Sequence, residues 1–202
     1  RKMEITFPKR PYRTHGGAHV PHQKNTAHME TRVMPPPDEV TLPMTQHIGA
    51  PCTPVVKKGD HVYVGTKVAD SDAYVSAPIH ASVSGTVKEI AKVMMPGGQM
   101  ADAVVITSDG LMERDPAIAP PEIRTKQQLA QAARDAGLVG LGGAGFPAHV
   151  KLNVPEGKSI DTLIVNVAEC EPYITSDHRE ALENGENVLH GVYKIKEILG
   201  VA

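Results

Sequence analysis

A glycine-rich segment in the second half of the chain carries the clearest chemical signal of the sequence. Residues 140–147 read Gly-Leu-Gly-Gly-Ala-Gly-Phe-Pro, with four glycines in six positions. Glycine tolerates positive φ angles and lets a ligand lie directly against the main chain. Where such a loop leads into a helix, its free N–H groups favour a phosphate. The segment therefore predicts either a phosphate-binding loop or a tight structural turn, and the glycines alone do not separate the two.

Polar residues downstream of the glycines favour the binding loop. Lys151 falls one turn into the helix that we expect next, where its amine could reach back to an anionic ligand. Residues 162–167 form a mainly apolar run typical of a buried parallel strand, and Asn166, Glu169 and Glu171 cluster where it ends. Ligands of open α/β sheets bind beyond the carboxyl ends of strands. These groups could hold a cofactor ring, ribose or nicotinamide; the alternative is that both acids are solvated loop charges.

The elements that must position these residues fall into two differently built parts. Short β-type runs punctuated by Gly, Asp and Pro predict a small sandwich or barrel, followed by a proline-bearing linker and helical periodicity. We expect a helix capped at Thr125 and stopped by Gly137, and a long last helix capped at Ser176 or Asp177. The sequence thus predicts an α+β chain. The strand candidates are residues 41–44, 54–56, 61–64, 67–69, 74–76, 85–90 and 103–107.

The composition excludes several classes of function. A formal net charge of -2 gives no footprint for nucleic acid, and no apolar run approaches the roughly 18 residues that cross a bilayer, so membrane association would come through partner subunits. The two cysteines, Cys52 and Cys170, form no C-x-x-C pair, which argues against zinc, iron–sulfur ligation or a disulfide framework and for a reducing, cytoplasmic compartment. Because the expected sheet has one clear strand, we expect a truncated domain.

Residues 140–152 and 166–174 together closely resemble the RnfC family, whose members are subunits of the Rnf electron-transport complex, and, more distantly, the NADH-binding flavoprotein subunit of respiratory complex I. In that wider family the glycine loop cradles FMN, its Phe stacks near the nicotinamide, and the helix Lys contacts the flavin phosphate. The complex I relatives usually have Arg and Asp where this chain has Leu141 and Ala168. By position, the resemblance implies cofactor-binding roles for Gly140, Gly142, Gly143, Gly145, Phe146, Lys151, Asn166, Glu169 and Glu171.

The first half of the chain carries the same resemblance. Residues 15–21 and 46–51 are similar to the amino-terminal signature of the RnfC family, and residues 75–87 to its barrel–sandwich domain, which is related to biotinyl and lipoyl carriers. The resemblance implies an extended arm over residues 1–39, a barrel–sandwich hybrid domain over 40–115, and the start of a Rossmann-like α/β FMN- and NADH-binding domain over 122–202.

The resemblance also implies a function. The complete protein would be a peripheral subunit of an ion-translocating ferredoxin:NAD oxidoreductase, on the cytoplasmic face of a bacterial or archaeal membrane. It would take hydride from NADH onto FMN and pass electrons to 4Fe–4S clusters held further along the chain. Because the flavin carries the chemistry, no catalytic side chain is expected. Two alternatives stay open: an inactive docking module, and a relative such as the cobalamin-reducing flavoprotein of propanediol-using microcompartments.

Three other features could bear chemistry, and we interpret each as structural. A biotin- or lipoate-bearing carrier needs a lysine between Val68 and Val75, and this interval has none. Cys170 lies beside two acids whose like charge disfavours its thiolate, so we expect a packed or ligand-adjacent thiol rather than a nucleophile. A proline-rich arm without cysteine is a poor metal site, so we expect no metal on its histidines, His15, His19, His22 and His28.

Overall fold

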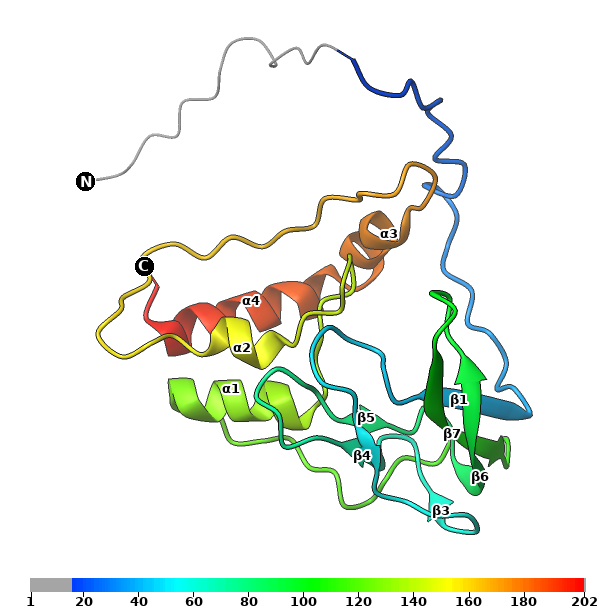
Figure 1. Cartoon of the computed structure of the whole chain (residues 1–202). Helices are drawn as coiled ribbons and strands as arrows, with labels where there is room; N and C mark the ends of the chain where they lie inside the picture. The colour runs from blue at the N-terminus through cyan, green and yellow to red at the C-terminus, as the bar shows by residue number, and fades with distance from the viewer. Residues whose placement is uncertain (1–15, 202) are drawn as a thin grey trace.

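The computed structural model describes residues 16–201. Within them the chain forms a β-rich unit over residues 39–108 and a group of helices from residue 126 onward (Figure 1). Residues 16–38 contain no helix or strand, and the expected features at residues 1–15, including His15, lie outside the described part.

The β-rich unit consists of two antiparallel sheets. One has the strand order β1-β7-β6-β3 and the other β2-β4-β5. The first contains β1 (Glu39–Pro43), β7 (Met100–Ser108), β6 (Gly85–Met94) and β3 (His61–Val62). The second contains β2 (Thr53–Pro54), β4 (Lys67–Asp70) and β5 (Ile79–His80).

Small aliphatic side chains fill the space between the two sheets. With no Trp in the chain, the core is built from residues such as Val68, Val87, Val104 and Ile106, each at most 1% exposed. The prediction of a small barrel or sandwich is confirmed. One predicted strand, residues 74–76, is wrong: this stretch is a loop, and the strand β5 follows it instead.

The first helix has the ends that the sequence predicts. Thr125 and Gln128 form a capping box at the start of α1 (Lys126–Asp135), in which Gln128 N donates to Thr125 Oγ1 over 3.2 Å and Thr125 N to Gln128 Oε1 over 3.1 Å. Gly137, with φ +66°, follows the end of the helix. The apolar face of α1 packs on α2 (Ala148–Leu152) and α4 (Gly185–Leu199), around a small core that contains Leu129 and Leu199.

The long last helix is two helices, which corrects the prediction. Residues of α3 (Ser176–Glu183) and α4 are separated at Asn184, whose φ and ψ of -121° and 20° leave the helical region. Asn followed by Gly is a weak helix-forming pair, so the break costs little. The residue that caps α3 is Thr175, without a side-chain hydrogen bond, rather than Ser176 or Asp177.

The prediction of a buried parallel strand over residues 162–167 is also wrong. This stretch has no strand assignment and runs as an extended loop between α2 and α3 (Figure 1). Ile164 is 84% exposed and Val167 53% exposed. A parallel strand is stable only between partner strands with both faces covered. No strand within residues 16–201 pairs with residues 162–167.

The arm contacts the start of α3. Lys24 Nζ donates to the carbonyl oxygens of Glu171 (2.9 Å) and Ile174 (2.6 Å), and the hydroxyls of Thr26 and Thr175 lie 2.6 Å apart.

None of the helices within residues 16–201 is long and apolar enough to span a membrane.

Candidate functional site

The glycine loop forms one wall of a cavity of about 420 Å³. The opposite wall comes from the extended loop and the first turn of α3, through Asn166, Cys170 and Asp177. Residues from three separate segments of the chain are thus gathered at one place. The residues predicted from the sequence that line the cavity are Gly140, Gly142, Gly143, Gly145, Phe146, Lys151 and Asn166.

Backbone hydrogen bonds close the base of the glycine loop. Gly140 N donates to the carbonyl of Phe146 over 2.9 Å, and Ala148 N to the carbonyl of Leu138 over 2.8 Å. The tip is open: a Cβ added at Gly142 or Gly143 would meet no atom within 4 Å. The main chain at the tip therefore faces free space, where a ligand could lie against it.

Gly145 has a different role from the glycines at the tip. It has φ +64°, and a Cβ at this position would lie 3.0 Å from the carbonyl oxygen of Gln46 and 3.1 Å from His47 Cα. Beside it, Ile48 N donates to the carbonyl of Ala144 over 2.9 Å. A Cβ at residue 145 would therefore strain the contact by which the glycine loop docks on the connection between β1 and β2.

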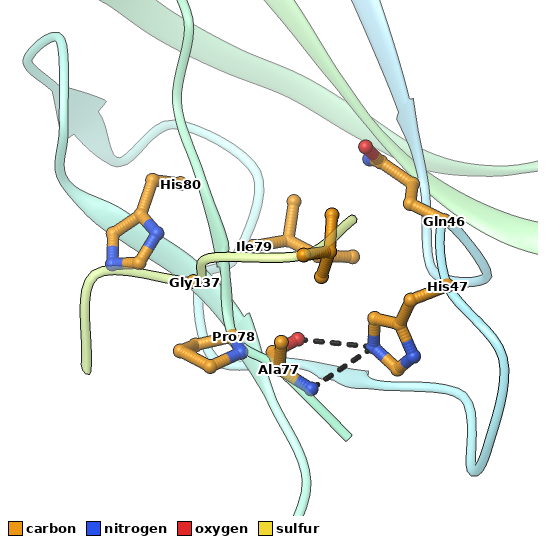
Figure 2. A pocket seen from close by; sticks show the side chains of 8 residues that line it. Gln46, His47, Ala77, Pro78, Ile79, His80 and Gly137 are labelled. Atoms are coloured by element: carbon orange, nitrogen blue, oxygen red, sulfur yellow. Dashed lines mark hydrogen bonds between the residues drawn. The ribbon is translucent and has the colours of Figure 1, made fainter. Parts of the chain in front are cut away.

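His47 belongs to that connection and holds it in place through buried hydrogen bonds. The residue is only 8% exposed; its Nε2 accepts the N–H of Ala77 over 3.1 Å, and its Nδ1 lies 3.1 Å from the carbonyl of Ile48. The same Nε2 also lies 3.1 Å from the carbonyl oxygen of Ala77, so the ring is held against both backbone groups of this residue. Figure 2 shows the His47 ring turned toward Ala77 at one side of a smaller cavity of about 150 Å³, with His80 and Gly137 on the other side.

Burial favours the uncharged forms of Cys52, which contacts His47, and of His80, which lines the same small cavity as His47. Cys52 donates from Sγ to the carbonyl of Ala77 over 3.2 Å, and burial raises the pKa of its thiol. Burial also lowers the pKa of His80, and the charge of Lys67 adds to this effect. In their uncharged forms, these groups add no charge to the region on which the glycine loop docks.

Lys151 supplies the cavity with a positive charge. It lies on α2, and its Nζ stands 5.8 Å from the centre of the Phe146 ring, within range of a cation–π contact. The same Nζ would lie 3.7 Å from a Cβ at Gly140. The amine, the aromatic ring and the open glycine backbone therefore face the same space.

The two acids predicted for the site do not line the cavity. Glu169 caps α3: its Oε2 accepts the N–H of Asp177 over 2.9 Å, and its Oε1 accepts the hydroxyl of Ser176 over 3.3 Å. A carboxylate is well placed there because the first N–H groups of a helix lack partners. Glu171 instead accepts a hydrogen bond from Cys170 Sγ over 3.1 Å.

Some cavity residues were not predicted as site residues from the sequence, namely Leu141, Ala144, Ala168 and Asp177. Cys170 also lines the cavity, with Sγ 3.9 Å from the carbonyl of Gly142. The hydrogen bond to Glu171 and the charge of that residue raise the pKa of the Cys170 thiol. The position of Asp177 depends on how α3 folds back, for which the sequence carries no signal.

No cluster of three metal-ligating side chains occurs among residues 16–201. The carrier-type interval between Val68 and Val75 is held by hydrogen bonds to the helices: Arg134 Nη2 donates to the Ser71 carbonyl over 2.6 Å, and His149 Nε2 to the Tyr74 carbonyl over 2.8 Å.

Comparison with protein families divides the chain as the fold does. Residues 12–111 match the RnfC barrel sandwich hybrid domain, and residues 133–202 match the Nuo51 FMN-binding domain. The second match contains the glycine loop, Lys151, Asn166 and the whole opposite wall of the cavity. The sequence-based prediction of a barrel–sandwich unit followed by the start of an FMN-binding domain is confirmed.

Individual relatives point the same way. The chain is 43% identical over 190 residues to the RnfC protein of the Na⁺-translocating ferredoxin:NAD⁺ oxidoreductase complex of Acetobacterium woodii, covering 92% of this chain and 43% of the relative. It is 47% identical over 191 residues to the proton-translocating counterpart of Clostridium ljungdahlii, covering 92% and 42%. The corresponding protein of the ion-translocating oxidoreductase complex of Rhodobacter capsulatus is 37% identical over 202 residues, covering 98% and 39%. The chain thus spans less than half the length of these relatives, and it belongs to the RnfC family.

Proposed function

We propose that the cavity binds FMN and that the natural full-length protein uses this flavin to move electrons between NADH and iron–sulfur clusters in an ion-translocating ferredoxin:NAD⁺ oxidoreductase. The observation that carries the proposal is the single cavity in which the glycine loop, Lys151 and Asn166 meet, inside the segment that matches an FMN-binding domain.

The residues present fit the chemistry of FMN. The phosphate is an anion, and the open backbone at Gly142 and Gly143 offers N–H groups to its oxygens while Lys151 supplies the charge. Phe146 offers an aromatic surface for the ring system, and the Asn166 amide offers both a donor and an acceptor for its heteroatoms. A volume of about 420 Å³ is within the usual range for cofactor sites.

When bound, FMN supplies hydride acceptance and one-electron transfer. The chain's own residues orient it and control charge around it. Cys170 stays a neutral thiol at the wall because the neighbouring Glu171 raises its pKa, so it adds no negative charge to the site. Asp177 is a further acceptor at the wall, suited to a ribose or nicotinamide group of NADH.

The clusters and the other subunits belong to the same proposal. Because no metal-ligating cluster occurs among residues 16–201, we propose that the 4Fe–4S clusters are bound by other residues of the natural protein. We also propose that the protein is peripheral, held at the cytoplasmic face of the membrane by its partner subunits, whose presence is implied by the names of the relatives.

Flavin titration tests the proposal. The natural full-length protein is titrated into FMN and, separately, into riboflavin, which lacks the phosphate, and flavin fluorescence is followed. We expect fluorescence to change on binding and FMN to bind at least about tenfold more tightly, because a charge-assisted phosphate contact is worth on the order of 1.5–3 kcal/mol. Absence of FMN binding at tens of micromolar would overturn the proposal and favour the docking-module alternative.

A further inference from the structure

We propose that the barrel–sandwich unit sets the position of Lys151 through a contact between Tyr74 and His149, which makes these two positioning residues of the flavin site. The proposal rests on the proposed FMN-binding function and names how the site is kept in shape. It is carried by the end of β4 and the loop after it, residues 70–74, which lie against α1 and α2.

His149 is the residue that attaches α2 to the barrel–sandwich unit. It is 5% exposed, its Nε2 donates to the carbonyl of Tyr74 over 2.8 Å, and its ring meets the Tyr74 ring edge-on at 5.7 Å between centroids and 87° between planes. Asn153, one turn further along, donates from Nδ2 to the Tyr74 hydroxyl over 2.8 Å. Tyr74 thus receives contacts from both ends of this short helix.

The helix α2 depends on such contacts. It has five residues, and its N-cap, Pro147, makes no side-chain hydrogen bond to the first turn. Helices this short are unstable by themselves, because one turn does not repay the cost of nucleation. The orientation of α2 is therefore set by what it packs against.

The spacing of His149 and Lys151 links this anchor to the cavity. With 3.6 residues per turn, side chains two positions apart point roughly 200° apart around a helix. When the His149 face lies on Tyr74, the Lys151 face is turned to the other side, where Lys151 lines the cavity. A rotation of α2 that released His149 would carry the Lys151 amine away from the glycine loop.

An ion pair fixes the same loop to α1. Arg134 Nη2 lies 2.9 Å from Asp70 Oδ1 and donates to the Ser71 carbonyl over 2.6 Å. Burial acts to raise the pKa of Asp70, but the hydrogen bonds from Lys67 and Arg134 outweigh it and lower this pKa to about 2. The loop therefore holds both helices in position relative to the barrel–sandwich unit, at the place where carrier domains display a modified lysine.

A double-mutant cycle tests whether His149 acts through Lys151. We compare wild type, His149→Leu, Lys151→Ala and the double variant for affinity toward FMN and riboflavin. We expect His149→Leu to weaken FMN about tenfold, to leave riboflavin unchanged, and to add no loss in the Lys151→Ala background, since coupled residues are non-additive. His149→Gln keeps a donor near the Nε2 position and should restore most of the affinity. Additive losses, or equal losses for riboflavin, would overturn the proposal.

A second measurement needs no flavin, so the failure of this proposal can be told from the failure of the proposed function. Hydrogen exchange of the amides of residues 150–153 should be at least about tenfold faster in His149→Leu than in wild type. His190→Leu, an exposed position on α4, is the matched control and should leave these amides unchanged. Unchanged exchange in His149→Leu overturns the positioning role even if FMN binds; faster exchange without FMN binding overturns only the cofactor assignment.

Discussion

The main chain of Gly145 lies so close to His47 that a Cβ at residue 145 would stand 3.1 Å from His47 Cα and 3.0 Å from the carbonyl oxygen of Gln46. This contact joins the glycine loop to the barrel–sandwich unit. Gly145 lines the cavity as the other glycines of the loop do, and in addition it packs against the barrel–sandwich unit.

Gly145→Ala should therefore destabilise the protein, and Gly142→Ala should not. The first change adds a Cβ to a residue with φ +64° and forces it against the main chain, which we expect to cost about 1–3 kcal/mol in the free energy of unfolding. The second adds a Cβ in open space and should instead reduce FMN affinity. Denaturant unfolding and flavin titration of both variants make the comparison; equal stability losses would contradict it.

Lys151→Ala should reduce affinity for FMN by about tenfold or more and affinity for riboflavin very little, because the amine faces the proposed phosphate position. Lys158→Ala is the control, since Lys158 is exposed and does not line the cavity. Fluorescence titrations give the ratio of the FMN and riboflavin affinities for each variant. An equal loss of affinity for both flavins would mean that Lys151 contacts a part of the cofactor other than the phosphate.

Glu169→Ala should lower the free energy of unfolding by about 1 kcal/mol, because it removes the acceptor for the first N–H groups of α3. The neighbouring Glu171→Ala lacks this capping role and serves as the control. Thermal unfolding followed by circular dichroism measures both. If Glu169→Ala left stability unchanged and abolished flavin binding, the residue would be a ligand contact rather than a cap.

The stabilisation by Asp70, through its ion pairs with Lys67 and Arg134, should depend on pH in the acid range. The pKa of Asp70 is lowered from 3.8 to about 2 in the folded protein, so the stabilisation is complete above about pH 4 and is lost as the pH falls toward 2. The difference in melting temperature between wild type and Asp70→Asn should be constant from pH 7 to about 5 and shrink below pH 4. A difference that stays constant down to pH 2 would contradict the prediction.

Local signals made part of this structure predictable. The capping box of Thr125 and Gln128, the stop at Gly137 and the β-type runs of the barrel depend on residues close together in sequence. The glycine loop and Lys151 share a cavity because only a short stretch separates them.

Other features depend on distant parts of the chain. Residues 162–167 have a strand-like composition, but strand formation needs partners that residues 16–201 do not supply. The role of Gly145 depends on a loop from the other half of the chain, and the role of Glu169 as a cap on the conformation of residues 170–175, which brings its carboxylate to the start of α3. Composition at Glu169 or Gly145 cannot reveal either contact.

The attachments on both flanks of the glycine loop determine how this protein can be dissected. Ile48 holds the loop at Ala144, and Tyr74 holds the helix after it at His149. The exposed linker at residues 116–121 invites a cut between the two units, by protease or by gene truncation. A helical piece separated there would lose both attachments, so the two halves should be expressed together, and a nicked chain should stay associated and retain the proposed affinity for FMN.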